Sequence, residues 1–224
     1  MRATADLTGI YRALFKRFGP QHWWPGDSPF EVMVGAILTQ NTNWKNVALA
    51  IGNLKKNGCL DPRRISELTK KRLAKLIKPS GFFNQKAGYI RDFCAYYSAR
   101  YGNDEARMRS VTTGKLRREL LELKGIGPET ADSILLYALG KPVFVIDAYT
   151  KRVFSRHGLF PENARYDEWQ GFFMSGLPKS AKLYNEYHAL IVRLAKEHCR
   201  VKPDCTACPL MDVKVVNVRK DVKV

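Results

Sequence analysis

The chain has 224 residues, 45% of them hydrophobic, and carries 38 Lys and Arg against 21 Asp and Glu, a formal net charge of +17. This apolar fraction excludes a disordered chain and suffices for one large or two small globular domains. Because the positive charge is spread along the chain, we expect a polyanionic partner, with nucleic acid the first choice. Charge alone also leaves open a basic protein without such a partner.

The N-terminal segment MRATADLTGIYRALFKRFG places Asp, Lys and Arg among its apolar residues, so it lacks the uninterrupted core of a signal peptide. No other apolar run is long enough to span a membrane. We therefore expect a cytoplasmic protein without a membrane partner. Since disulfides are rare in that compartment, the five cysteines require another explanation.

Apolar residues recur at spacings of three and four, which predicts helices roughly 8 to 16 residues long. In chain order these segments are 10–18, 30–38, 45–54, 87–101, 115–123, 130–139, 148–159 and 184–199. Prolines and glycines separate them. The β-branched run PVFVID at 142–147 is too short and too isolated to build a sheet. The pattern predicts an all-α fold.

A tight hydrophobic turn, LKGIGP at 123–128, separates two of these helices. Gly125 and Gly127 permit a positive φ and a close backbone approach, and Ile126 fills the space between the helices. Pro128 suits the first turn of the next helix, where its missing N–H costs nothing. The free amides of such a hairpin form a phosphate site. Alternatively, the turn only joins two core helices.

Asp147 follows an apolar segment and begins a basic amphipathic helix, at 148–159. An aspartate at this position is either a plain N-cap or an acid held by apolar walls at the mouth of a cleft. In the second interpretation the carboxylate faces the ligand that the hairpin holds.

Four segments in this order resemble the helix-hairpin-helix-GPD superfamily of DNA glycosylases, the endonuclease III group, over most of the chain. They are GAILTQNTNWKNV, IKPSGFFNQKAGYI, LxGIGPxTA and VFVIDAYxxRV. The resemblance implies two helical domains with the active-site cleft between them. We expect residues 26–141 to form the bundle with the hairpin, and residues 1–25 with 142–224 to form the other domain. The partner implied is double-stranded DNA containing a damaged base, and we expect a monomer.

By this resemblance Asp147 is the catalytic acid, since a carboxylate in a dry cleft stabilises the oxocarbenium ion that forms as a glycosidic bond breaks. Bifunctional members carry a lysine where this chain has Glu129, and a carboxylate cannot form the imine that leads to strand cleavage. We therefore expect a glycosylase of base excision repair without AP lyase activity. Glu129 either holds water in the pocket or is an ordinary first-turn acid. Lys124, in the hairpin, is expected to contact a phosphate.

Trp23, Trp24 and Trp44 resemble base-pocket residues of the family's bacterial 3-methyladenine branch. Flat walls suit a flipped base, and a cationic alkylated purine gains from cation–π stacking on them. We therefore expect an alkylated purine such as 3-methyladenine as the substrate. Core packing is the alternative role for these tryptophans. The alternative functions are a glycosylase for mismatched or oxidised pyrimidines or uracil, and a DNA-binding module without catalysis.

Gln40, and Phe82 or Phe83, resemble the residues that wedge into the duplex and fill the space left by the base. Asn84 and Lys86 are then expected to lie near phosphates. A Phe pair bounded by Gly and Asn is also typical of a capped helix joint.

Cys199, Cys205 and Cys208 lie close together near the C-terminus. Many family members hold a [4Fe-4S] cluster with four cysteines in this region, but here the first gap is one residue shorter and Lys214 occupies the fourth position. His198 or an acidic side chain such as Asp212 completes a cluster or a zinc site in one interpretation. In the other, the cysteines are a remnant. No cofactor is expected to take part in the chemistry.

Overall fold

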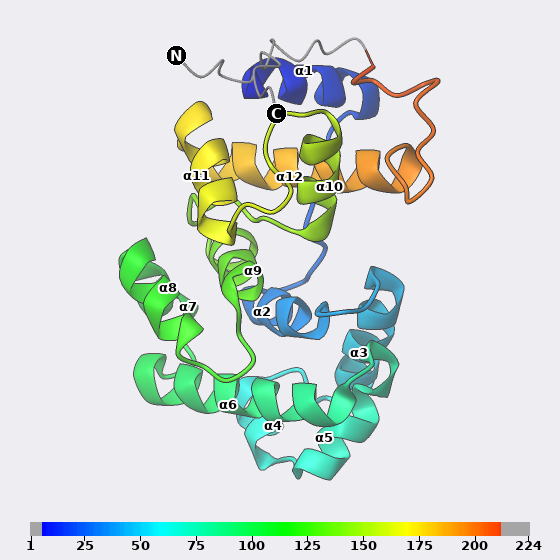
Figure 1. Ribbon diagram of the computed structural model, residues 1–224. Coiled ribbons are helices and arrows are strands. Elements are labelled where there is room, and N and C mark those ends of the chain that lie inside the picture. The colour runs from blue at the N-terminus through cyan, green and yellow to red at the C-terminus, as the bar shows by residue number, and fades with distance from the viewer. Residues whose placement is uncertain (1–5, 212–224) are drawn as a thin grey trace. The chain divides into compact units, whose positions relative to one another are not determined.

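Helices account for the regular structure of residues 6–211, the part of the chain that the computed structural model describes (Figure 1). No strand occurs within this range, and the segment 142–147 has no regular secondary structure. The all-α prediction is confirmed. None of the described helices is both long and apolar enough to cross a membrane.

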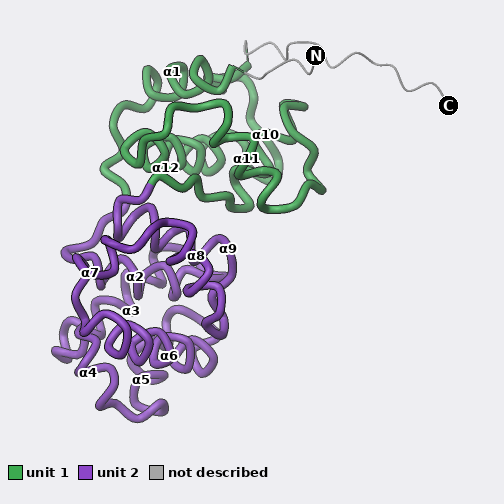
Figure 2. Tube along the Cα trace, turned by 90° about the vertical axis from the view of Figure 1, so that its left-hand side faces the viewer, with its two compact units in different colours: residues 1–23, 142–224 green, residues 24–141 purple. Residues whose placement is uncertain are grey.

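The chain divides into two compact units (Figure 2). Unit 2 comprises residues 24–141, and unit 1 comprises residues 1–23 with 142–224. Unit 2 contains α2 (Pro29–Leu38), α3 (Trp44–Lys56), α4 (Pro62–Glu67), α5 (Lys70–Leu76), the 3-10 turn η1 (Lys78–Ser80), α6 (Phe83–Tyr101), α7 (Glu105–Ser110), α8 (Thr113–Leu121), α9 (Pro128–Ser133) and the π-helical turn η2 (Ile134–Ala138). Unit 1 contains α1 (Leu7–Phe18), α10 (Ala148–Arg156), α11 (Tyr166–Gly176) and α12 (Ala181–Glu197).

The helix α2 forms the core of unit 2. Ser28 caps its first turn by accepting a hydrogen bond from the amide of Glu31, and Pro29 occupies the first helical position. Its apolar residues are buried on all sides, because α3, α6, α9 and η2 all pack against it. A helix enclosed in this way gives the loops at its ends a fixed support.

Aromatic side chains form the core of unit 1. Phe144 stacks on Phe173 with ring centroids 4.1 Å apart, and Phe154 meets Phe173 edge to face at 4.7 Å. Phe144 and Phe154 come just before and within α10, so this packing holds the start of α10 on both sides. The helix α12 packs against both α1 and α10.

Helix lengths vary more than the periodicity predicts. The helix α6 has 19 residues, whereas α4 and α7 have six each. Asp61 and Asp104 cap the two short helices, and each helix ends in extended backbone at Leu68 or Val111. Segments this short leave too few periodic positions for a pattern to identify them.

Candidate active site

The side chain of Asp147 caps the first turn of α10. Its Oδ1 atom accepts a hydrogen bond of 2.7 Å from the amide of Thr150. The preceding residue, Ile146, is buried, and its amide donates to the hydroxyl of Tyr166 at 3.3 Å. The N-cap role of Asp147 is therefore confirmed, and the catalytic role stays a prediction.

A histidine of α12 is the second partner of this carboxylate. The Nε2 atom of His188 lies 3.5 Å from Oδ2 of Asp147, and the Asp147 side chain is only 13% exposed. Burial would raise the pKa of Asp147, but His188 and the hydrogen bonds from Thr150 outweigh burial and leave this pKa below its ordinary value. The carboxylate is thus ionised at neutral pH. No sequence pattern marked His188, which lies within a regular helical segment.

Cations and aromatic rings gather on α10 and α12 near Asp147. The Lys196 ammonium lies 5.9 Å from the ring centroid of Tyr149 and 6.0 Å from that of Trp23. The guanidinium of Arg152 lies 5.1 Å from the Tyr149 ring. Trp23 thus belongs to unit 1, where a cation already stands over its ring.

The hairpin of unit 2 joins α8 to α9. Gly125 has a φ of +80°, and a Cβ atom built on it would overlap the ring of Tyr89, so this position needs glycine. Ile126 is buried and α9 begins at Pro128, as predicted. The prediction for Gly127 needs correction, because its φ of −88° is ordinary and no atom lies within 4 Å of a Cβ built there.

Two polar side chains, Gln40 and Arg117, hold the hairpin in place. The Gln40 amide donates to the carbonyl of Gly125 at 2.8 Å and to the hydroxyl of Thr130 at 3.0 Å. Arg117 of α8 makes a bidentate pair with Asp132 of α9, which is fully buried. The Gln40 loop and the hairpin therefore form one connected structure.

Glu129 and Lys124 are both exposed, on either side of the hairpin glycines. Glu129 is the second residue of α9, in the first turn where the helix dipole favours an acid. This position is compatible with both interpretations of Glu129 that the sequence left open.

Trp24 and Trp44 lie together in unit 2, and their role as walls of a base pocket stays a prediction. Their ring centroids are 5.1 Å apart in an edge-to-face arrangement. Tyr137, from the π-helical turn, lies 5.1 Å from Trp24 on a tilted plane. Sequence reasoning missed Tyr137, because it lies more than a hundred residues beyond Trp24 inside an otherwise ordinary helical pattern.

Phe82 precedes α6 and is unusual in two ways. It is 62% exposed, and its φ of +45° is a left-handed conformation that is uncommon outside glycine. Phe83 is half-buried and Asn84 is exposed. The ring of Phe82 is thus exposed at the start of α6, and its wedge role stays a prediction.

Lys86 does not fit the phosphate contact predicted for it. Its side chain is buried, and its ammonium donates to the carbonyl of Leu38 at 2.9 Å and to that of Ser80 at 2.7 Å. Burial lowers the pKa of Lys86 to about 8. Lys86 thus joins the end of α2, just before Gln40, to η1, just before Phe82.

The family model for HhH-GPD superfamily base excision DNA repair proteins matches residues 34–179. The chain belongs to this superfamily. A candidate DNA repair glycosylase of Methanocaldococcus jannaschii is 48% identical over 204 residues, 91% of this chain and 93% of that protein. Endonuclease III of Sulfolobus acidocaldarius is 30% identical over 184 residues, 82% of this chain and 80% of that protein.

Two solved structures extend the comparison. The 3-methyladenine DNA glycosylase of H. pylori, bound to 1,N6-ethenoadenine, has a TM-score of 0.75 and 33% identity, covering 86% of this chain and 98% of that chain. A trapped endonuclease III–DNA covalent intermediate has a TM-score of 0.81, with coverage of 95% and 96%, but its 22% identity makes it a likeness of fold. This member of the HhH-GPD superfamily is thus a DNA glycosylase of base excision repair, as predicted.

The three C-terminal cysteines differ in their surroundings. Cys199 is buried, with its Sγ atom 3.5 Å from Nη1 of Arg156, whereas Cys205 is exposed. Within residues 6–211, no group of three or more His, Cys, Asp or Glu side chains is arranged to hold a metal ion. Asp212 and Lys214 lie outside the described residues.

Arginines of α10 hold the loop that carries these cysteines. Arg152 donates to the carbonyl of Cys199 at 2.7 Å, and Arg156 donates to that of Arg200 at 2.6 Å. These charge-assisted bonds attach the loop to the same helix that Asp147 caps.

Proposed function

We propose that this chain is a monofunctional DNA glycosylase that releases an alkylated purine by hydrolysis. The observation that carries the proposal is the partly buried carboxylate of Asp147 at the start of α10, with its Oδ2 atom 3.5 Å from Nε2 of His188. Such a carboxylate stabilises positive charge on a sugar at little cost in reorganisation.

In the proposed reaction, the bond between C1′ of the deoxyribose and the base nitrogen breaks, and its electron pair leaves with the base. Positive charge develops on the sugar and is balanced by the Asp147 carboxylate. The oxygen of a water molecule then bonds to C1′ and its proton passes to the solvent, which leaves an abasic site in an intact strand. A cationic alkylated purine departs as a neutral base, so its bond breaks more readily.

Glu129 supports the absence of AP lyase activity. It follows the hairpin at the position where bifunctional relatives carry the lysine nucleophile, and a carboxylate forms no imine with the sugar. Borohydride added during turnover is therefore expected to trap no covalent protein–DNA adduct. A trapped adduct would contradict this part of the proposal.

The aromatic group of Trp24, Trp44 and Tyr137 supports the choice of a purine. Its rings supply the flat apolar surfaces on which a flipped base stacks. The H. pylori relative, 33% identical, is a 3-methyladenine glycosylase bound to a modified adenine. The hairpin amides beside Gly125 and the exposed ring of Phe82 are proposed to hold the DNA backbone and the emptied base stack.

Base release from duplexes that each carry one lesion tests this function. We expect release from duplexes with 3-methyladenine, and little from duplexes with uracil, a mismatched thymine or an oxidised pyrimidine. A preference for any of the latter would replace the substrate assignment.

Asp147→Asn separates a glycosylase from a binding module. The substitution keeps an N-cap but removes the charge, so we expect damaged DNA to bind while base release falls roughly 100-fold or more. Release at the parental rate would overturn the assignment of Asp147.

A further inference from the structure

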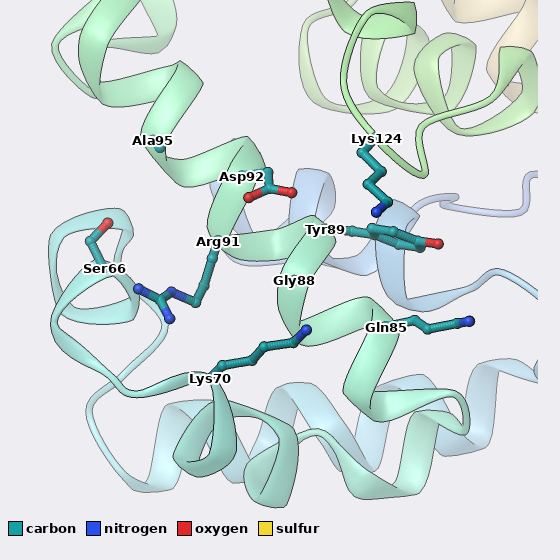
Figure 3. Close-up of a pocket in the computed structure, with 9 residues that line it drawn as sticks. All are labelled: Ser66, Lys70, Gln85, Gly88, Tyr89, Arg91, Asp92, Ala95 and Lys124. Atoms are coloured by element: carbon teal, nitrogen blue, oxygen red, sulfur yellow. The ribbon is translucent and has the colours of Figure 1, made fainter.

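A hollow of about 470 Å³ lies on unit 2 next to the hairpin (Figure 3). One face of α6 forms its floor, where Gln85, Tyr89 and Asp92 recur three or four residues apart. Lys124 borders it from the hairpin, and Ser66 of α4 and Lys70 of α5 border it elsewhere. The hollow thus brings together four separate segments of the chain.

Three cations surround this hollow, against the single carboxylate of Asp92. Figure 3 shows Lys124 reaching toward Tyr89, Lys70 reaching toward Gly88, and Arg91 on the side of Ser66. Within residues 6–211 no carboxylate pairs with any of the three, whereas Lys55 and Arg117 elsewhere in unit 2 hold carboxylates at 2.7 and 2.8 Å. Neighbouring cations without carboxylate partners leave a local positive potential that attracts an anion.

Two glycines shape the hollow and connect it to the hairpin. At Gly88 the floor has no side chain, and the Lys70 ammonium lies 3.6 Å from the point where a Cβ would stand. The ring of Tyr89 packs directly against the backbone of Gly125. The hollow therefore lies next to the hairpin, where a DNA strand bound to the hairpin would continue.

We propose that the hollow binds the phosphodiester backbone of the DNA beyond the hairpin, with Lys70 and Arg91 each contacting a phosphate. This deepens the proposed function, since it assumes that the hairpin itself lies on DNA. The chemistry fits: a guanidinium fork and an ammonium are the usual phosphate partners, and Ser66 and Gln85 add neutral donors. The lining is mostly polar, which suits a backbone rather than a stacked base.

The double variant Lys70→Gln, Arg91→Gln tests the proposal through the salt dependence of binding to undamaged duplex DNA. Each phosphate contact adds about 0.9 to the slope of log affinity against log salt concentration, so we expect the slope to fall by roughly 1.8. At 0.1 M salt this corresponds to a Kd raised roughly tenfold or more.

Lys56→Gln, Lys75→Gln is the matched control, since it removes the same charge from exposed positions of unit 2 outside the hollow. Its slope is expected to stay within experimental error of the parent. Circular dichroism checks that both variants fold. Equal slopes for the two double variants would overturn the proposal.

A free nucleotide carries the same phosphate chemistry as DNA. Loss of adenosine monophosphate binding in the double variant, with an unchanged DNA slope, would overturn the proposal in favour of a nucleotide site. Because the binding test uses undamaged DNA, its result does not depend on whether the protein releases a base. A protein with the expected slopes that releases no base would refute the proposed function and support the hollow.

Discussion

The Asp147 carboxylate and the Nε2 atom of His188 lie 3.5 Å apart, one at the start of α10 and the other within α12. The two helices pack against each other in unit 1, so the pair is built into the core of that unit. His188 contributes most to lowering the pKa of Asp147, with hydrogen bonds from Thr150 adding to it. A positioning residue for the proposed catalytic acid is thus supplied from a helix far along the chain.

His188→Gln is expected to move the acid limb of the pH–rate profile to higher pH. Base release requires the carboxylate form, so activity is lost as the pH falls through the pKa of Asp147. Without His188 that pKa rises, and the loss begins at higher pH. Single-turnover base release across acidic pH measures the shift. His157→Gln, at the other end of α10, is the control, and an unmoved limb in His188→Gln would contradict the assignment.

Trp44→Leu is expected to slow base release from alkylated duplexes about tenfold, with undamaged DNA bound as before. The substitution removes the ring that meets Trp24 edge to face, and stacking on one ring contributes roughly 1–3 kcal/mol. Leu49→Ala, an exposed position on the same helix, should release base at the parental rate. Equal rates for the two variants would argue for core packing at Trp44.

Gly125→Ala and Gly127→Ala are expected to differ sharply. A methyl group at Gly125 meets the Tyr89 ring in left-handed backbone, so we expect a loss of about 1–3 kcal/mol in unfolding free energy. At Gly127 the backbone is ordinary and the space is open, so the change should lie within about 0.5 kcal/mol. Urea denaturation compares the two, and similar losses would refute this account of the hairpin.

Lys86→Met is expected to destabilise the protein by about 1–3 kcal/mol at neutral pH. The thioether matches the length of the buried stem but leaves the carbonyls of Leu38 and Ser80 without a donor. Urea denaturation measures the loss.

The pH dependence of the unfolding free energy tests whether the amine of Lys86 is buried in the folded protein. Burial lowers the pKa of Lys86 from 10.5 to about 8, so between these pH values the unfolded chain retains a proton that the folded protein has released. Raising the pH through this window therefore favours the folded state. The unfolding free energy of the parent should rise relative to that of Lys86→Met, and parallel curves would contradict the buried position.

The sequence was sufficient for features that depend on neighbouring residues. Three- and four-residue periodicity predicted the long helices, and the LKGIGP turn predicted the buried Ile126 and the helix start at Pro128. An acid after an apolar run offered a cap at Asp147 as one of two roles, and the structure shows that cap. These features follow from local backbone geometry and capping, which a short stretch of chain determines by itself.

Only the tertiary structure decided which distant side chains meet. The sequence motif around Lys86 predicted a phosphate contact at the surface. In the structure Lys86 is buried, and its ammonium donates to carbonyls at the end of α2 and in η1. His188 and Tyr137 occupy unremarkable helical positions until packing brings them to Asp147 and Trp24. A pattern of residue types records the face on which a side chain lies, but burial and pairing depend on which other helix covers that face.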